Sequence, residues 1–420
     1  MQEERKSNKF LPGFFAGILV TLGICFVVVG VFFIITINSS KLSMLHTGAI
    51  PGTGTTEEVD TLDWNAITEK SKTIAEMLNQ VYMGDIDPDA MEQNIYKGIF
   101  ASLNDPYTVY YTPEEYAKMM ESDSGVYCGA GVLVTQLSDS NLVQIVRVYD
   151  GSSAKEAGMQ PGDVIVKVND EDVTALDLNS VVALIRGEEG TWCKVTIYRE
   201  SEKKYLDCNI QRRVVTAESV DYKMLDDGVG YISVSQFDEP TDEQFIAAVE
   251  KLLKEGMTSL VIDMRDNPGG LVDVAVKMLD RLLPKGTITY TEDKYGNRSP
   301  YNSDATELNI PMAVLINGNS ASASEIFAGA LRDYDKAILV GTKSFGKGIV
   351  QTVIPLDDGS GIKITFAKYF SPKGTNIHGS GFEPDVEVKM SDEEYRSFRL
   401  NRLDPKDDTV LQTAIENLKK

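Results

Sequence analysis

The spacing of apolar residues divides the chain into segments of different character. From residue 10 to residue 37 nearly every side chain is apolar and none is charged. Because about 20 such residues span the hydrocarbon core of a bilayer, residues 10–37 are predicted to form a transmembrane helix. Arg5, Lys6 and Lys9 precede this run. By the positive-inside rule, residues 1–9 are then a cytoplasmic tail, and the chain beyond the helix lies outside the cytoplasm.

A cleaved secretory signal is the alternative for the same run. Such a signal has a shorter apolar stretch that is followed by a cleavage site of small residues. The sequence from Thr36 to Ser40 is a poor match to that site, which favours a retained anchor in the cell membrane. Residues 38–60 are rich in Gly, Ser and Thr without an apolar period, so they are predicted to be a linker.

Residues 61–125 show the three-to-four-residue apolar spacing that is typical of helices. A first helix is predicted from Trp64 to Val81. Further helices are predicted after Asp87-Pro88 and Thr112-Pro113, because Asp and Thr cap helix starts and proline fits the first turn. We interpret this segment as a packing or interface module without chemistry of its own, and the helical termini as the contact surface of a homodimer.

Residues 126–213 change to the period of two that is typical of strands. The segment is expected to form strands at 131–134, 142–148 and 164–168, helices at 153–159 and 178–186, and a closing hairpin at 193–210. Cys193 and Cys208 flank that hairpin and could be cross-strand neighbours. We favour reduced thiols over a disulfide, since spacing alone does not establish bridge geometry.

Residues 214–390 combine buried strands with helices. The largely apolar segment 260–265 and the continuous apolar run that begins at residue 312 and precedes Asn317 are typical of strands that are covered on both faces. Each run leads through a turn of small residues into a helical pattern, which predicts parallel strands with right-handed crossovers. The polar residues 285–310 are expected to form a strand and an exposed loop, and the C-terminal region 391–420 to be helical.

Length and charge fit this division. A chain of 420 residues is too long for one ordinary domain. The fold is therefore predicted to be α/β and multidomain, with a membrane helix, a helical region, a β-rich domain and an α/β core. The formal net charge of −22 argues against a nucleic-acid partner, because phosphate binding needs a basic patch.

The candidate chemistry is concentrated between Asn319 and Gln351. The chain has two histidines, His46 and His378, so a Ser-His-Asp triad would depend on His378. A Ser-Lys pair is another way to activate a hydroxyl group. It requires a lysine that is neutral at the working pH, although the unperturbed pKa of lysine is about 10.4.

The surroundings of Lys347 in the sequence suit this demand. Phe345 and Ile349 are expected to supply apolar cover, and the two flanking glycines would let the backbone approach closely. Burial disfavours the charged form and lowers the pKa of a lysine. Gln351 could hydrogen-bond the amine without adding charge. Lys347 taken alone, however, would be typical of a solvated loop lysine.

The hydroxyl partner is one of three serines that open a predicted helix after residues 312–317. Ser320, Ser322 and Ser324 are all candidates, and helix capping is the structural alternative for each of them. These residues alone do not choose among the three. The N–H groups of the helix start could stabilise an oxyanion, and the turn at 266–270 offers a second set of donors.

The phrase SSAKEAGMQPGDVIVKVND, within residues 126–213, resembles a PDZ domain. A PDZ domain adds an extended peptide to the edge of its sheet. The resemblance implies that Gly129, Ala130, Gly131 and Val132 offer N–H donors to the C-terminal carboxylate of a bound protein tail. On its own, this glycine pair would suit a hairpin turn equally well.

Six phrases in order resemble the carboxy-terminal processing peptidases, which are tail-specific serine proteases. They are DPYTVY, the PDZ phrase, DMRDNPGG, SASASEI, FGKGIVQ and GFEPDV. The resemblance implies a protease core of the ClpP and crotonase kind. It implies that Ser322 is the nucleophile, that Lys347 is the general base and that Gln351 assists it.

The same resemblance implies roles for three further residues. The oxyanion donors would be the backbone N–H groups of Gly270 and Ala323. Arg186, in the phrase Ile185-Arg186-Gly187, would take part in activation by the PDZ domain, whose placement would keep the resting site misaligned. No metal and no cofactor are implied.

Two other classes of function are weighed against a membrane-anchored serine endopeptidase. One is a PDZ-based peptide-binding or chaperone protein with an inactive catalytic site, against which the intact Ser, Lys and Gln set argues. The other is a crotonase-like acyl-CoA enzyme, which would leave the PDZ segment unexplained.

Overall fold

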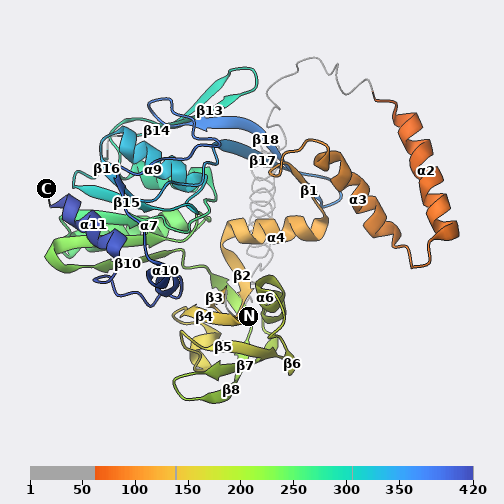
Figure 1. Ribbon diagram of the computed structural model, residues 1–420, viewed down its shortest axis with the longest axis horizontal. Helices are drawn as coiled ribbons and strands as arrows, with labels where there is room; N and C mark the ends of the chain where they lie inside the picture. The colour runs from red at the N-terminus through yellow and green to blue at the C-terminus, as the bar shows by residue number, and fades with distance from the viewer. Residues whose placement is uncertain (1–61, 138–139, 305, 420) are drawn as a thin grey trace, which may run out of the picture. The chain divides into compact units, whose positions relative to one another are not determined.

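The computed structural model describes residues 62–137, 140–304 and 306–419 (Figure 1). The predicted tail, membrane helix and linker at residues 1–60 lie outside these ranges. Within them, no helix has both the length and the apolar character that a membrane span requires. The chain divides into two units after Ile86.

The described part of the first unit holds α2 (Trp64–Val81), as predicted from its apolar spacing. Asp63 caps this helix, because its Oδ1 accepts a hydrogen bond of 2.9 Å from the N–H of Ala66. Its apolar stripe is exposed and consists of Trp64, Ile67, Ile74, Met77, Leu78 and Val81.

The second unit begins with two further helices, α3 (Pro88–Ala101) and α4 (Pro113–Ser124). Asp87 and Thr112 cap them, so both predicted helix starts are confirmed. The segment between the two helices forms a strand, β1 (Val109–Tyr111), which the helical interpretation of residues 61–125 missed.

The β-rich domain follows the predicted order of elements. Its sheet has the order β3-β4-β5-β7-β8, with β6 paired to β5, and β3 lies at an edge. The bounds are β3 (Val132–Gln136), β4 (Val143–Val148), α5 (Ser153–Glu156), β5 (Val164–Val168), β6 (Glu171–Asp172), α6 (Leu178–Ile185), β7 (Trp192–Arg199) and β8 (Lys204–Gln211). A separate pair, β2 (Val126–Gly129) with β9 (Arg213–Thr216), joins the two ends of the domain.

The hairpin of β7 and β8 settles the question of the two cysteines. Cys193 lies opposite Ile210, and Cys208 lies opposite Val195. Both thiols are free and buried, and burial raises the pKa of each. The favoured reading of reduced thiols is confirmed.

The core is a six-stranded sheet of the order β10-β11-β12-β15-β16-β19. All neighbours are parallel except β10 and β11, as the crossover pattern predicts. The bounds are β10 (Val220–Met224), β11 (Val229–Val234), β12 (Ser259–Asp263), β15 (Met312–Ile316), β16 (Ala337–Gly341) and β19 (Val386–Glu387), with a short 3₁₀ turn, η1 (Asp226–Gly228), between β10 and β11.

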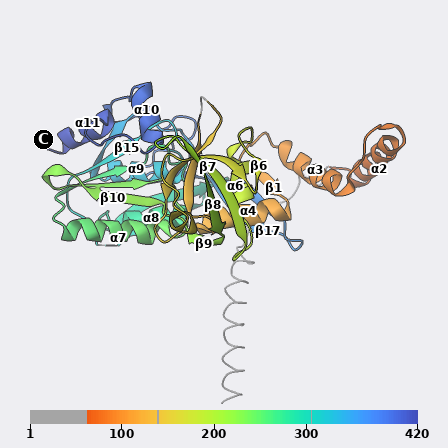
Figure 2. The ribbon, with the colours of Figure 1, turned by 90° about the horizontal axis from the view of Figure 1, so that it is seen from below.

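Both faces of this sheet are covered (Figure 2). Ile262 and Val314 face one side, which is covered by α7 (Thr241–Lys254), α8 (Val272–Asp280) and α9 (Ala323–Asp333). Val261 and Leu315 face the other side, against α11 (Thr409–Leu418). Two apolar faces explain why β15 is apolar throughout and why the middle of β12 is apolar, since burying each such side chain contributes about 1.5–3 kcal/mol.

A second sheet lies beside the core and has the order β1-β18-β13-β14, with β17 also paired to β18. Its remaining strands are β13 (Gly286–Asp293), β14 (Arg298–Ser303), β17 (Ile349–Pro355) and β18 (Gly361–Phe370). Residues 285–310 therefore contain a paired hairpin, where one strand and a loop were expected. The sheet also connects β1 to the strands that follow Lys347.

Candidate active site

Ser322 lies at the junction between β15 and α9. It is the N-cap residue of α9 and has φ 56° and ψ −115°. A left-handed φ is uncommon for a residue other than glycine, and strained backbone of this kind clusters at functional sites. The position also places Ser322 at a helix N-terminus, whose partial positive charge favours a nearby anion.

The three candidate serines differ in their surroundings. Ser320 and Ser324 are fully buried. Their hydroxyl groups donate to the carbonyl oxygens of Met264, at 2.7 Å, and Asn267, at 2.9 Å. Ser322 is partly exposed. Of the three, Ser320 and Ser324 therefore have structural roles, and Ser322 is accessible to a substrate.

A buried carboxylate joins Ser322 to the loop that carries Lys347. Glu325, in the first turn of α9, is 1% exposed. Its Oε2 accepts hydrogen bonds from the backbone N–H groups of Ser322, at 3.0 Å, and Lys347, at 2.8 Å. Its Oε1 accepts from the Ser344 hydroxyl, at 2.5 Å, and the Gly346 N–H, at 2.8 Å. These are charge-assisted bonds, which are about twice as strong as neutral ones.

Tyr369, on β18, forms a second connection between the same two segments. Its hydroxyl group contacts the carbonyl oxygens of Ser322, at 3.1 Å, and Lys347. Burial raises the pKa of this hydroxyl well above its ordinary value, so it remains a protonated donor. The backbones of Ser322 and Lys347 are thus held together from two sides.

The glycines that flank Lys347 allow the close approach that was predicted. A Cβ atom on Gly346 would lie 2.9 Å from the nitrogen of Gly381, and one on Gly348 would lie 2.6 Å from the nitrogen of His378. Gly346 also has φ +96°, which larger residues rarely adopt. The loop therefore packs backbone to backbone against residues 376–381.

The turn after β12 meets the start of α9. A Cβ atom on Gly269 would lie 2.8 Å from the Cβ of Ser322 and 3.0 Å from the nitrogen of Ala323. Gly270 packs against Phe237, whose carbonyl oxygen would lie 2.2 Å from an added Cβ. Within the described residues, the N–H groups of Gly270 and Ala323 donate to no protein acceptor. The two predicted oxyanion donors thus belong to adjoining segments.

The Lys347 side chain extends toward β1. Its Nζ lies 4.6 Å from the ring centroid of Tyr107. Among the described residues it forms no ion pair, and no hydrogen bond connects it to Ser322 or Gln351. The Gln351 amide instead donates to the hydroxyl oxygen of Thr365, at 3.3 Å.

Two expectations about Lys347 are corrected here. Phe345 is 56% exposed and gives no cover, whereas Ile349 is buried as expected. Tyr107 supplies the contact that was assigned to Phe345. The segment 61–125, interpreted as a packing module alone, therefore contributes directly to the surroundings of Lys347.

The surroundings of Lys347 make its neutral form easier to reach than that of an exposed lysine. Burial lowers its pKa below the ordinary value, and the positive charge of Lys363 lowers it further, while Asp105 acts in the opposite direction. A lysine that serves as a base needs a lowered pKa of this kind.

Side chains of the C-terminal region contact the turn at 266–270 and the residue that precedes it. The Tyr395 hydroxyl, on α10 (Asp392–Arg399), donates to Asp266 Oδ1 at 2.9 Å. The Asn319 side chain donates to the same oxygen at 2.8 Å. Arg265, whose side chain is 2% exposed, pairs with Asp408 at 2.8 Å. These contacts hold the Gly269–Gly270 turn and the loop before Ser322 in fixed positions.

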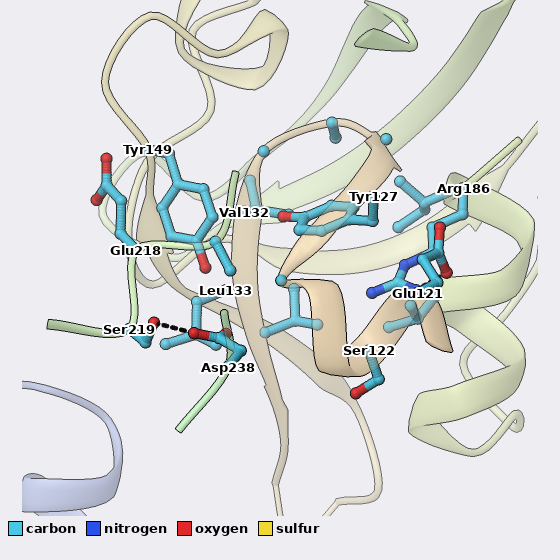
Figure 3. Close-up of a pocket in the computed structure, with 18 of the residues that line it drawn as sticks. Glu121, Ser122, Tyr127, Val132, Leu133, Tyr149, Arg186, Glu218, Ser219 and Asp238 are labelled. Carbon is cyan, nitrogen blue, oxygen red and sulfur yellow. Dashed lines mark hydrogen bonds and ion pairs between the residues drawn. The ribbon is translucent and has the colours of Figure 1, made fainter. Parts of the chain in front are cut away.

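A groove borders the edge strand β3 and helix α6 (Figure 3). It has a volume of about 270 Å³, and Gly129–Val132 line one end of it. Gly131 has φ +78°, and a Cβ atom there would lie 2.4 Å from that of Ser152. The opposite wall comes from the core and includes Ser219 and Asp238. An open strand edge of this kind can accept an extended peptide.

Arg186 lies at the end of α6 and lines the same groove (Figure 3). Its Nη1 donates to Glu121 Oε2 of α4 at 2.6 Å. Its guanidinium also lies 4.5 Å from the ring centroid of Tyr127, on β2. Arg186 therefore connects the β-rich domain to the helix that precedes it.

Comparison with known proteins bears on these sites. Residues 228–388 match the model of Peptidase family S41, and residues 144–199 match the PDZ domain model. Residues 228–388 therefore form a Peptidase family S41 domain. The S41 match contains Ser322 and Lys347, and the PDZ match contains Arg186. The Tyr107 segment and the α10–α11 segment lie outside both matches.

Two staphylococcal proteins are among the relatives of this chain. The probable CtpA-like serine protease of Staphylococcus aureus (strain N315) is 37% identical over 323 residues, which are 76% of this chain and 64% of that protein. Its counterpart in Staphylococcus epidermidis is 35% identical over 324 residues, which are 76% of this chain and 65% of that protein. The chain thus spans about 64% of the length of these curated relatives.

Two solved structures are similar to this chain. A putative S41 protease from Bacteroides fragilis matches with a TM-score of 0.53 and 17% identity, over 76% of this chain and 87% of that chain. The photosystem II D1 C-terminal processing protease is 29% identical, with a TM-score of 0.47, over 76% of this chain and 86% of that chain.

Three residues near the site escaped the sequence analysis of this chain. Glu325 follows Ser322 by three positions, and this Ser-x-x-Glu spacing is the capping-box signature that could have identified it. Tyr107 and Tyr369 carry no comparable local signal. The whole PDZ domain and most of the core lie between Tyr107 and Lys347 in the sequence, and the pairing of β1 with β18 brings the two segments together.

Proposed function

We propose that this protein is a serine endopeptidase that binds the C-terminal tails of proteins and cleaves them with a Ser322–Lys347 dyad. The observation that carries the proposal is the double connection of the Ser322 and Lys347 backbones through Glu325 and Tyr369. This connection is built beside the N–H groups of Gly270 and Ala323, in an S41 domain.

In the proposed reaction, neutral Lys347 takes the proton of the Ser322 hydroxyl while Oγ attacks the scissile carbonyl carbon. The N–H groups of Gly270 and Ala323 stabilise the oxyanion that forms. Lys347 then gives its proton to the departing amine, which breaks the C–N bond and leaves an ester on Ser322. A water molecule, deprotonated by Lys347, hydrolyses this ester and restores the serine. Gln351 orients the amine without altering its charge.

Substrate delivery is assigned to the groove beside β3. An extended tail would pair with β3, and its carboxylate would lie at the N–H groups of Gly129–Val132. Arg186 would report occupancy, because a bound tail competes for the space that Glu121 and Arg186 share at the groove. The 4.6 Å contact of Lys347 with Tyr107 suits a resting state in which the base is turned away from Ser322.

The test is cleavage of a protein with an unstructured C-terminal tail by the full-length chain. Ser322→Ala and Lys347→Ala should each lower kcat by at least a thousandfold. Ser320→Ala is the matched control, and its kcat per folded molecule should equal that of the parent. Arg186→Ala should lower both basal and tail-stimulated rates. Equal cleavage by the parent and Ser322→Ala chains would refute the assignment.

A PDZ-based binding protein with an inactive site is the second candidate. The turned-away Lys347 is the observation that favours it. A fluorophosphonate probe separates the two candidates, because only an activated serine reacts with it. Labelling of Ser322 in the presence of a bound tail peptide supports the peptidase, and no labelling under that condition supports the binding protein.

Two further parts of the proposal concern location and assembly. Residues 10–37 would anchor the chain in the cell membrane, with the S41 domain outside the cytoplasm. The test is whether the tail 1–9 is protected from added protease in sealed cells. The exposed apolar stripe of α2 would contact a second copy of the chain. Sedimentation of Ile67→Glu together with Ile74→Glu as a monomer would support this, and an unchanged profile would exclude it.

A further inference from the structure

Among the described residues, the half-buried amine of Lys347 makes one direct contact that favours its charged form, with the ring of Tyr107, while the negative charge of Asp105 acts in the same direction. The Nζ lies 4.6 Å from the ring centroid, within the range of a cation–π contact. This contact stabilises the ammonium form by attraction to the ring face, and it offers little to the neutral amine. Lys347 must be neutral to accept a proton as a base. The ring therefore disfavours the catalytically competent form of the lysine, because it stabilises the ammonium.

The backbone at Tyr107, from which the ring extends, is held in place by hydrogen bonds of its own segment. Asp105 Oδ1 accepts a hydrogen bond from the Tyr107 N–H at 2.9 Å, and its Oδ2 accepts from the Thr108 hydroxyl at 2.6 Å. The Thr108 oxygen in turn accepts from the N–H of Thr365 on β18, at 2.9 Å. Thr365 is also the partner of the Gln351 amide. Strand β18, through Thr365, therefore helps to position both the Tyr107 segment and Gln351. Both residues line the same hollow as Lys347.

Among the described residues, no charged group forms an ion pair with Lys347, although the charge of Asp105 favours its ammonium form. A hollow of about 730 Å³ contains the amine together with charged groups from α3, α4, β18 and the segment before β1. Two of them form an ion pair with each other, at 2.7 Å, and a third pairs with Glu114. These charged groups are Asp105, Lys363, the pair Lys97 and Glu115, and Lys118.

We propose that Tyr107 is a positioning residue for Lys347, whose ring retains the ammonium in the resting site and sets the pH at which the lysine becomes available as a base. The proposal rests on the proposed function of Lys347. It adds a residue outside the S41 and PDZ matches to the machinery of the site.

The test is the pH profile of kcat/KM for tail cleavage by the full-length chain. Tyr107→Leu keeps apolar bulk and removes the ring, so the ammonium loses its partner. The acid limb should move to lower pH by about half to one unit, with KM unchanged within twofold. Tyr107→Phe keeps the ring face and should leave the limb within about 0.2 units of the parent.

Tyr111→Leu is the matched control, because it removes a tyrosine from the same segment without touching Lys347. Its acid limb should coincide with that of the parent. The rate at which a fluorophosphonate labels Ser322 gives a second pH profile that is independent of peptide binding, and it should show the same shift.

Three results would overturn the inference. One is a Tyr107→Leu limb that coincides with the parent, and another is a Tyr107→Phe limb that moves as far as that of Tyr107→Leu. If Tyr107→Leu does not fold, Tyr107→Trp decides, since its stronger cation–π contact should raise the limb and an unmoved or lowered limb refutes the role. Lys347→Ala separates this outcome from a failure of the proposed function, because full activity in that variant would refute the dyad itself.

Discussion

Glutamine in place of Glu325 is a sharp test of the connection between Ser322 and Lys347. The two side chains have the same shape, so the change opens no cavity. It converts one acceptor oxygen into an NH₂ group and removes the charge. Each Glu325 oxygen accepts two hydrogen bonds, so the new donor group must face two donors in either orientation.

The cost follows from comparing those orientations. At the Oε2 position the NH₂ group would oppose the backbone N–H groups of Ser322 and Lys347, and neither can reverse. At the Oε1 position it would oppose the Gly346 N–H, while the Ser344 hydroxyl can rotate and accept. The second orientation is therefore preferred, and it leaves the Gly346 N–H and one hydrogen of the new NH₂ group unpaired, which costs at least about 1–3 kcal/mol. We expect the free energy of unfolding to fall by about that amount.

Activity should fall as well, because the lost bonds fix the backbone of both proposed catalytic residues. A loss of about 1.4 kcal/mol in the transition state lowers kcat tenfold, so kcat should fall about tenfold or more. Urea unfolding followed by far-ultraviolet circular dichroism is the stability assay. Tryptophan fluorescence is unsuitable, since Trp64 and Trp192 are 52% and 64% exposed.

Glu394→Gln is the matched control. Glu394 makes the same capping box with Ser391 at the start of α10, away from Ser322 and closer to solvent. It should lose less than about 1 kcal/mol, as exposed caps do, and should keep its kcat. Glu325→Gln with parental stability and kcat, or a larger loss in Glu394→Gln, would refute the reasoning.

Three further outcomes are expected. Lys347→Met should raise stability at pH 7 by about 0.5–2 kcal/mol, because burial lowers the pKa of Lys347 and the unfolded chain then binds more protons. The gain should shrink as unfolding is measured toward pH 10.4, and a gain that does not vary with pH would contradict it. Gly269→Ala should lower kcat at least a hundredfold, because its φ is +102° and the added methyl would lie 2.8 Å from the Ser322 Cβ; parental kcat would disprove the close approach. Asp408→Asn should cost about 3 kcal/mol in urea unfolding, since it leaves the buried Arg265 with one carboxylate fewer, and a loss below about 1 kcal/mol would count against the buried pair.

Much of the architecture was predictable because its causes are local. The largely apolar segments at 260–265 and 312–317 predicted strands buried on both faces, and both form the centre of the core sheet. Asp87 and Thr112 marked two helix starts, since capping involves residues only two or three positions apart. The period of two predicted the β-rich domain for the same reason.

Spacing within one segment was also enough to identify candidate residues. The spacing placed three serines at a helix start and a lysine between two glycines. It also placed the glycine turn at 266–270 after a strand. It did not distinguish Ser322 from Ser320 and Ser324, because that choice depends on burial and on hydrogen bonds to Met264 and Asn267 across the sheet edge.

The surroundings of Lys347 were decided by the tertiary structure alone. Phe345, its neighbour in sequence, points to solvent, and the contact comes from Tyr107 through the pairing of β1 with β18. Likewise Glu325 meets Lys347 only because α9 and the loop after β16 converge at the same sheet edge. A sequence determines which residues can cap, pair or bury locally, whereas the partner of a side chain across the fold depends on how distant strands close around it.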